Sequence, residues 1–417
     1  MKNAVKWSSI ALAVAMGNGL IAANAVAQTT ERAEGIVEGA SASLSNRTMY
    51  FNRDFRSTDS ANKREEAATG LVLDFQSGFS EGPVGLGFDV VMMGGLKLDS
   101  GRGRAGTGIL QVEDGRASNE YSQIRGAVKA SILDDTVLRY GVHFTENPVI
   151  AYDDARLLPN HYNGYSITNE SIEGLTLEAG RMDRRGDMAD SSEYRGVFSD
   201  WIESEKVAYA GGTYTFNDAF SASLYTSKAD ELWKRHFLGL THTAEIGQDL
   251  SLTSELSHYH TSDDSEADVY GNKATSLSFT LGAGYHGFTL AAQRMGGDNG
   301  FAYQDGAIFL ANSVQYLDFN APDERSYQAR YDYSFEGLGI PGLTFMTRYI
   351  RGENIDVPGV RDTRWERDTN ISYTLQQGPL EGVNVLWRNA TVRQDAALDG
   401  GDVDENRLIV SYSWDLL

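Results

Sequence analysis

The chain has 417 residues, no cysteine, 44 glycines and 21 tyrosines, and its formal net charge is -22. Such an acidic chain is a poor partner for nucleic acid, and the absence of cysteine excludes the disulfide framework of small secreted domains. A chain of this length must then be held together by a large hydrogen-bonded structure, and low proline with many glycines and tyrosines favours antiparallel strands joined by turns.

Residues 1–27 predict a cleaved secretory signal peptide. Lys2 and Lys6 supply its positive start, a mostly apolar stretch follows, and Ala25-Val26-Ala27 is a small-x-small cleavage site. The alternative is a membrane anchor, but the apolar stretch is short and interrupted by a polar residue. The remaining residues, 28–417, are expected to form a single domain.

After the signal peptide, runs of about ten residues alternate between apolar and polar side chains. In Ala67–Phe79, Leu71 and Phe75 fall on one face with other apolar residues. In Arg325–Phe335, tyrosines alternate with polar or charged residues. The last run, Arg407–Leu417, places Leu408 and its even-numbered neighbours on one face, as a strand closing a barrel would.

The connections between these runs alternate between short and long. Residues 216–219 and 285–288 predict tight turns, whereas residues 145–170 and 296–324 are long. This rhythm is typical of a transmembrane antiparallel β-barrel. A soluble sandwich is disfavoured because its apolar face points inward and its connections do not alternate in this way. We count about seventeen runs, and single-chain bacterial barrels have even numbers of strands, so about eighteen strands around an aqueous channel are expected.

Several cations lie in these runs opposite apolar positions, although the chain is acidic. Because a charged side chain on the lipid face costs about 2–4 kcal/mol near the bilayer midplane, such cations should point into the barrel. They would form a basic track for an anionic cargo. The alternative is that they lie in solvated turns or pair with carboxylates inside the barrel. The predicted track is Arg47, Arg125, Lys129, Arg330, Arg348 and Arg388.

The predicted orientation of Arg393 differs from that of these six residues. Strict alternation from Arg388 puts it on the opposite face of the same strand, near the strand end, where a bulge or the membrane interface would accommodate it.

Six stretches of the chain carry a family resemblance: Asn46–Phe55, Gly94–Gly101, Leu158–Asn160, Ser166–Leu175, Trp365–Thr369 and Trp387–Thr391. Together they resemble the OprD porin family, the substrate-specific carboxylate channels of pseudomonad outer membranes. They are distributed over essentially the whole mature chain. The middle of the chain, Phe198–His260, matches weakly, and the chain ends in Leu417 where such barrels commonly end in phenylalanine.

The resemblance implies an eighteen-stranded barrel whose pore is narrowed by loops folded inward, with a ladder of arginines that leads carboxylates through the constriction. It implies a monomer, with a weak trimer as the alternative. The same resemblance, together with loop length and position, makes Thr145–Ser171 the expected constriction loop.

The two long loops carry the charged residues expected at the constriction. Arg156 would complete the arginine track at its narrowest point, unless the loop charges only pair with one another. The second loop would add acidic groups opposite the track and restrict the cargo. The expected constriction residues are Asp153, Asp154 and Asn160 in the first loop and Asp305 and Asp318 in the second.

We therefore expect a channel in the outer membrane of a Gram-negative bacterium that takes up small carboxylates by facilitated diffusion. Its partners would be these solutes, outer-membrane lipid and lipopolysaccharide. No catalytic residue, cofactor or metal site is predicted. The alternatives are a non-specific porin and a barrel-embedded lipid hydrolase.

Overall fold

The computed structural model describes residues 35–56, 63–133, 135–199, 202–398 and 400–417. The predicted signal peptide lies outside these residues. No helix in the described ranges is long and apolar enough to cross a bilayer.

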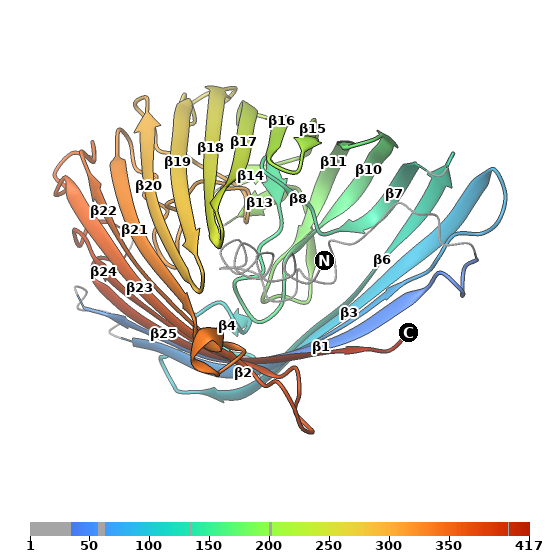
Figure 1. Ribbon diagram of the computed structural model, residues 1–417, viewed down its shortest axis with the longest axis horizontal. Coiled ribbons are helices and arrows are strands. Elements are labelled where there is room, and N and C mark those ends of the chain that lie inside the picture. Colours follow the sequence, from blue (N-terminus) through green and yellow to red (C-terminus); the bar gives the residue numbers. More distant parts are fainter. Residues whose placement is uncertain (1–34, 57–62, 134, 200–201, 399) are drawn as a thin grey trace.

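Eighteen antiparallel strands form a closed barrel, as predicted (Figure 1). The first and last strands, β1 and β25, close the wall by pairing from Ser43 opposite Asp415 to Phe55 opposite Val403. The wall strands are β1 (Ser41–Phe55), β2 (Lys63–Gln76), β3 (Val84–Ser100), β6 (Glu120–Ile132), β7 (Thr136–His143), β10 (His161–Ile172), β11 (Leu175–Gly186), β15 (Val207–Asn217), β16 (Phe220–Ala229), β17 (Trp233–Gly247), β18 (Leu250–Asp263), β19 (Asn272–Ala283), β20 (His286–Gly296), β21 (Arg325–Ser334), β22 (Leu343–Glu353), β23 (Thr363–Thr374), β24 (Asn384–Arg393) and β25 (Val403–Asp415).

The remaining elements are short and lie in the connections between wall strands. Of these, β12 extends the sheet by pairing with the end of β11. They are β4 (Val112–Glu113), β5 (Arg116–Ala117), β8 (Glu146–Asn147), β9 (Ile150–Ala151), β12 (Glu193–Arg195), β13 (Val197–Ser199), β14 (Ile202–Ser204) and the 3-10 helix η1 (Phe335–Leu338).

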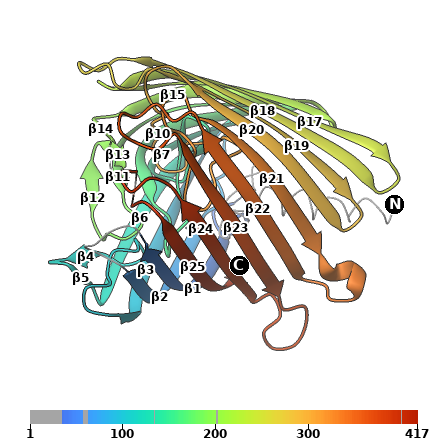
Figure 2. The same ribbon diagram turned by 90° about the vertical axis from the view of Figure 1, so that its left-hand side faces the viewer.

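Alternation along the strands separates an apolar outer face from a polar inner face. Leu71, Leu290 and Trp414 are exposed on the outside, which is the surface that lipid covers in a membrane barrel. The even-numbered residues of the last run face outward from Leu408 to Trp414, as the sequence indicates. Figure 2 shows the strands running obliquely along the wall, the tilt that barrel closure requires.

Three long loops, 101–119, 144–160 and 297–324, lie at one end of the barrel, and tight turns such as 284–285 lie at the other. The alternation is not strict, because the connection 230–232 at the loop end is also short. At the turn end, Gly284 has a φ of 57°, a left-handed conformation that glycine adopts without a steric penalty. The range predicted for the constriction loop, Thr145–Ser171, is too long. Its last eleven residues belong to β10, which begins at His161. From there the strand pairs with β7 on one side and β11 on the other, and Tyr165 and Ile167 face outward. Only the segment 144–160 is therefore a loop.

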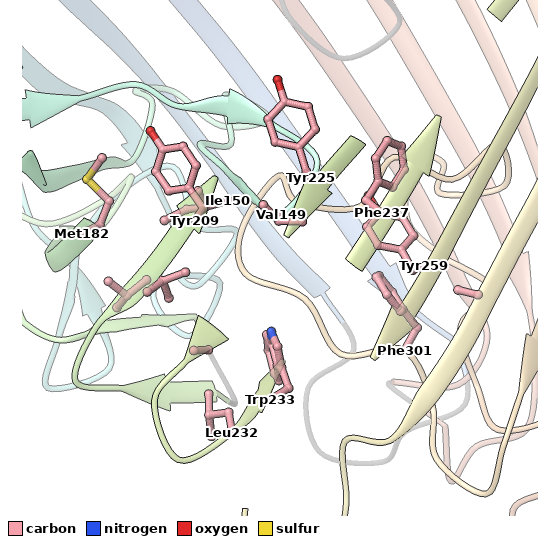
Figure 3. Packing of buried hydrophobic residues seen from close by; sticks show 14 of the residues in the cluster. Val149, Ile150, Met182, Tyr209, Tyr225, Leu232, Trp233, Phe237, Tyr259 and Phe301 are labelled. Carbon is pink, nitrogen blue, oxygen red and sulfur yellow. The ribbon is translucent and has the colours of Figure 1, made fainter. Parts of the chain in front are cut away.

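Two long loops, 144–160 and 297–324, fold inward and build an apolar core inside the barrel. Figure 3 shows Phe301 of the second loop beside Tyr259 of the wall, and their ring centroids are 4.8 Å apart. Phe237 packs against Tyr259 from the neighbouring strand, at 4.7 Å. Val149 of the first loop belongs to the same buried cluster. Burial of these side chains keeps both loops against the wall.

A third connection, residues 101–119 between β3 and β6, also contributes buried side chains. Ile109 and Leu110 of this segment belong to a cluster that includes Leu157 and Leu158 of the first inward loop. The sequence did not indicate this contact.

Candidate permeation pathway

An ion pair holds the first inward loop to the wall. The buried Arg47 of β1 donates from Nη1 to Asp154 Oδ1 at 2.8 Å and from Nη2 to Asp154 Oδ2 at 2.7 Å. Its Nη1 also donates to the carbonyl oxygens of Asp154, at 3.0 Å, and Arg156, at 2.6 Å. A bidentate pair of this kind fixes both position and orientation. Arg47 and Asp154 therefore anchor the loop.

A second ion pair anchors the other inward loop. Arg185 of β11 contacts Asp305, with 2.5 Å between Nη2 and Oδ1 and 2.9 Å between Nε and Oδ2. The hydroxyl of Tyr162 donates to Asp305 Oδ2 at 2.5 Å and to the carbonyl of Ala151 at 3.1 Å. The amide of Gly306 donates to the same carbonyl at 3.0 Å. The two loops thus meet at Ala151 and Asp305 inside the barrel.

The far end of the second loop is fixed by a carboxylate and an arginine of the wall strand β23. Glu366 of β23 accepts hydrogen bonds from the backbone amides of Tyr316, at 2.9 Å, and Leu317, at 2.7 Å. Glu324 at the end of the loop forms an ion pair with Arg364, with 2.6 Å between Oε2 and Nη2. Buried charges of this kind are tolerated because each is paired or hydrogen-bonded.

Between the loops and the wall lies a cavity of about 910 Å³. Three arginines line it: Arg156 of the first loop, Arg388 of β24 and Arg407 of β25. Arg388 and Arg407 lie directly opposite each other in adjacent strands. Arg407 contacts Glu405, with 2.6 Å between Nη2 and Oε1, and donates from Nη1 to the carbonyl of Ala155 at 3.2 Å. The loop and the wall thus place three cations on one cavity.

Arg156 differs from the anchoring arginines in its contacts. It donates from Nε to the carbonyl of Thr107 at 3.2 Å, and its guanidinium lies 5.5 Å from the ring centroid of Phe51. Within the described residues, Arg156 forms no salt bridge with a carboxylate. Arg156 therefore lines the cavity with no carboxylate within salt-bridge distance among the described residues.

Carboxylates line the same cavity. They include Asp153 of the first loop and Asp305 and Asp318 of the second. Asp318 accepts hydrogen bonds from the hydroxyls of Tyr303 and, at 2.6 Å, Ser313. Burial raises the pKa of Asp305 and of Asp318, and the charge of the nearby Asp153 adds to both increases. The cavity therefore combines basic and acidic groups.

Most of the predicted track residues pair with carboxylates, the alternative that the sequence left open. The distances between charged atoms are 2.8 Å for Lys129–Asp89, 2.7 Å for Arg330–Asp332 and 2.6 Å for Arg348–Asp368. Arg125 lies 3.6 Å from Glu193 and donates to His161 Nε2 at 3.1 Å. Among the described residues, Arg388 is the one member of the predicted six that lines the cavity.

Two further predicted residues lie away from the cavity. Arg393 faces outward and pairs with Asp404, with 2.9 Å between Nη1 and Oδ1, in agreement with strict alternation from Arg388. Asn160 is buried, and its Oδ1 accepts a hydrogen bond from the amide of Asp153 at 2.5 Å. Asn160 thus shapes the loop and does not line the cavity described here.

Arg407, Arg185 and Arg364 are not among the site residues predicted from the sequence. Arg407 was detectable, because the outward alternation from Leu408 to Trp414 places it on the inner face of the last strand. Arg185 and Arg364 lie at the loop ends of β11 and β23, where alternation alone does not show that an inward loop will meet them.

Comparison with known proteins agrees with the fold and the pore. A family model described as outer membrane porin, OprD family, matches residues 34–416. Porin D of Pseudomonas aeruginosa is 36% identical, with 99% of each chain covered.

Solved structures from the same organism give the same result. OccK9 (OpdG) superposes with a TM-score of 0.87 at 36% identity, covering 92% of this chain and 100% of that one. OpdK, solved with vanillate, has a TM-score of 0.84 at 33% identity, covering 91% of this chain and 100% of that one. The chain therefore belongs to the OprD family: it is an outer membrane porin of a Gram-negative bacterium, a channel and not an enzyme.

Proposed function

We propose that this channel takes up small monocarboxylates by facilitated diffusion past Arg156, Arg388 and Arg407. The observation that carries the proposal is that these three arginines, from one inward loop and two adjacent wall strands, line a single cavity. All the lining residues belong to one chain, so the proposal requires no oligomer.

The chemistry of arginine suits this role. A carboxylate that enters a narrow pore loses part of its hydration, and this loss opposes entry unless the wall supplies opposite charge. Arginine stays charged at any relevant pH and binds carboxylates in bidentate geometry. Several neighbouring cations allow the anion to pass from one to the next without being trapped.

A relative supports the choice of solute. OpdK was solved with vanillate, a small aromatic carboxylate, and is 33% identical to this chain over nearly its whole length. Vanillate carries one carboxylate and an otherwise weakly polar ring. A solute of this type is our first candidate.

The acidic side of the cavity supports a cargo with a single negative charge. Asp153 and Asp318 line the same cavity as the arginines. A second carboxylate on the solute would come close to these groups, and like charges at short range in a partly dehydrated site repel strongly. Monocarboxylates should therefore pass more readily than dicarboxylates.

Uptake into liposomes tests the proposal. The protein is reconstituted, and uptake of benzoate is compared with that of benzamide, which has the same ring without the charge. We expect faster uptake of benzoate, competition by other monocarboxylates, and loss of the difference in Arg388→Ala. The matched control is Arg330→Ala, an inward arginine outside the cavity. Equal uptake of both solutes, or no competition, would show a non-specific porin instead.

A further inference from the structure

A second group of cations lies on the outside of the barrel, near the loop ends of five consecutive strands. Each of these residues shares its face with exposed apolar or aromatic side chains, such as Leu290 in β20, Tyr327 in β21 and Tyr349 in β22. They therefore point away from the pore. This outer-wall basic patch consists of Lys273 (β19), Arg294 (β20), Arg325 (β21), Arg351 (β22) and Arg367 (β23).

The strand register brings these like charges together. Arg294 lies directly opposite Arg325. Arg351 is opposite Tyr327, two residues along from Arg325, which makes Arg325 and Arg351 diagonal neighbours, and such neighbours lie about 7–8 Å apart. Arg367 stands in the same relation to Arg351. Like charges placed directly opposite each other destabilise a sheet, and a bound anion would offset their repulsion.

The protein itself does not supply that anion in the described part of the chain. Glu353 is the acidic residue opposite Arg325 on this face, yet it forms no ion pair with it among the contacts described. Arg367 donates only to the hydroxyl of Thr391, at 3.1 Å, among its described hydrogen bonds.

Outward cations on either side of the patch are paired, which sets the patch apart. Lys228 and Lys234 lie 3.2 and 3.0 Å from Asp264. On the other side, Arg393 pairs with Asp404 at 2.9 Å. The unneutralised cations thus form one continuous region between two neutralised ones.

The position of the patch indicates where the anion comes from. The long loops mark the extracellular end of such barrels, and all five residues lie toward that end of their strands. Tyr327, Tyr349 and Trp365 lie among them on the outer face, and the rings of Tyr349 and Trp365 are 5.7 Å apart. Aromatic residues of this kind mark the level of lipid headgroups. The patch therefore faces the headgroups of the outer leaflet.

We propose that the outer-wall basic patch binds the phosphate groups of lipopolysaccharide. Arginine forms bidentate, charge-assisted hydrogen bonds with phosphate, and a pair of arginines on adjacent strands presents two such donors side by side. The acyl chains of the same molecule would lie along the apolar wall below. The inference depends on the outer-membrane location of the barrel and not on the solute that it carries.

Binding of lipid A to the purified, full-length protein tests the proposal. The protein is freed of lipopolysaccharide in detergent, and the dissociation constants of diphosphorylated lipid A and of chemically dephosphorylated lipid A are measured. Each cation near an anionic lipid surface strengthens binding about fivefold, so the triple variant Arg294→Gln, Arg325→Gln, Arg351→Gln should bind lipid A about a hundredfold more weakly. The matched control Lys228→Gln, Lys234→Gln removes paired outward cations and should bind like the wild type.

The wild type alone gives a second test that needs no variant. Native mass spectrometry should show retention of diphosphorylated lipid A and loss of the dephosphorylated form at the same detergent concentration. Equal retention of the two forms overturns the proposal, as does equal weakening in the triple and control variants. The proposal is also overturned if inorganic phosphate or phosphatidylglycerol displaces bound lipid A as effectively as unlabelled lipid A does. The patch would then not be a site for lipopolysaccharide.

Discussion

The inward arginines of this barrel fall into two regions with different surroundings. Arg47 and Arg185 are buried in bidentate ion pairs with Asp154 and Asp305, and these pairs hold the two inward loops. Arg156 and Arg388 instead line the cavity that the anchored loops enclose. Arginines inside the barrel thus anchor the loops in one region and line the cavity in the other.

The contrast shows that strand alternation places an arginine inside the barrel but does not assign its role. The role depends on the surroundings: Arg47 and Arg185 meet carboxylates of the loops, whereas Arg388 lines the cavity. The acidity of the chain is relevant here, since many of its carboxylates neutralise inward cations, as Asp89 does for Lys129 and Arg139.

Removal of a loop anchor should have the largest effect. Arg185→Ala leaves Asp305 buried without its arginine, and breaking such a pair costs about 3–5 kcal/mol. We expect the loop 297–324 to leave its position, with higher single-channel conductance and faster proteolysis of the loop. Arg330→Ala is the control, because its partner Asp332 lies in the same strand and contacts no loop through this pair. Unchanged conductance in Arg185→Ala would contradict the anchoring role.

Removal of a cavity arginine should have the next largest effect, on uptake and not on loop position. A hydrogen bond to a charged group contributes about 1.5–3 kcal/mol, so Arg388→Ala should slow benzoate uptake about tenfold or more. The control is Arg330→Ala, which removes an inward arginine outside the cavity whose partner, Asp332, lies in the same strand. Liposome uptake measures both. The two regions would not be distinct if both proteins lost uptake equally.

A smaller effect should follow from acidification. Because burial raises the pKa of Asp318, this carboxylate becomes neutral at a higher pH than an exposed aspartate as the solution is acidified. Loss of its negative charge leaves the cavity arginines less opposed. Anion preference, measured as a reversal potential in a salt gradient, should therefore rise between neutral pH and about pH 5.

Asp318→Asn provides the check on that assignment. It should have a higher anion preference at neutral pH and a weaker response to acidification than the wild type. An identical pH response in the variant would mean that another group is responsible.

The smallest effect is expected for Arg393. It faces outward and its partner Asp404 is also partly exposed, and such pairs contribute about 0–1 kcal/mol. Arg393→Ala should leave benzoate uptake unchanged and alter the unfolding temperature only slightly. A marked loss of uptake would place Arg393 in the pathway, against the observed register.

The fold was accessible from the sequence because its signal is local. The alternation that places Leu408 and Trp414 outward depends only on the period of a strand, and the same period places Arg388 and Arg407 inward. The start of β10 was missed because His161 lies within a stretch that reads as a loop, and it becomes a strand by pairing with β7 and β11.

The site was less accessible because it depends on contacts between distant segments. Arg47 and Asp154 are 107 residues apart, and Arg185 and Asp305 are 120 apart. No periodicity shows which loop carboxylate reaches which wall arginine. The burial of Ile109 against the first inward loop is of the same kind, since it follows from the path of three connections through one interior.

Ion selectivity of single channels tests the central claim most directly. The claim is that Arg156 and Arg388, which line the cavity, make the pore favour anions, and that Arg330, which lies outside the cavity, does not. The double variant Arg156→Gln, Arg388→Gln should lose most of the anion preference seen in the reversal potential, while Arg330→Gln keeps it. Undiminished anion preference in the double variant, with intact loops by proteolysis, would contradict the account.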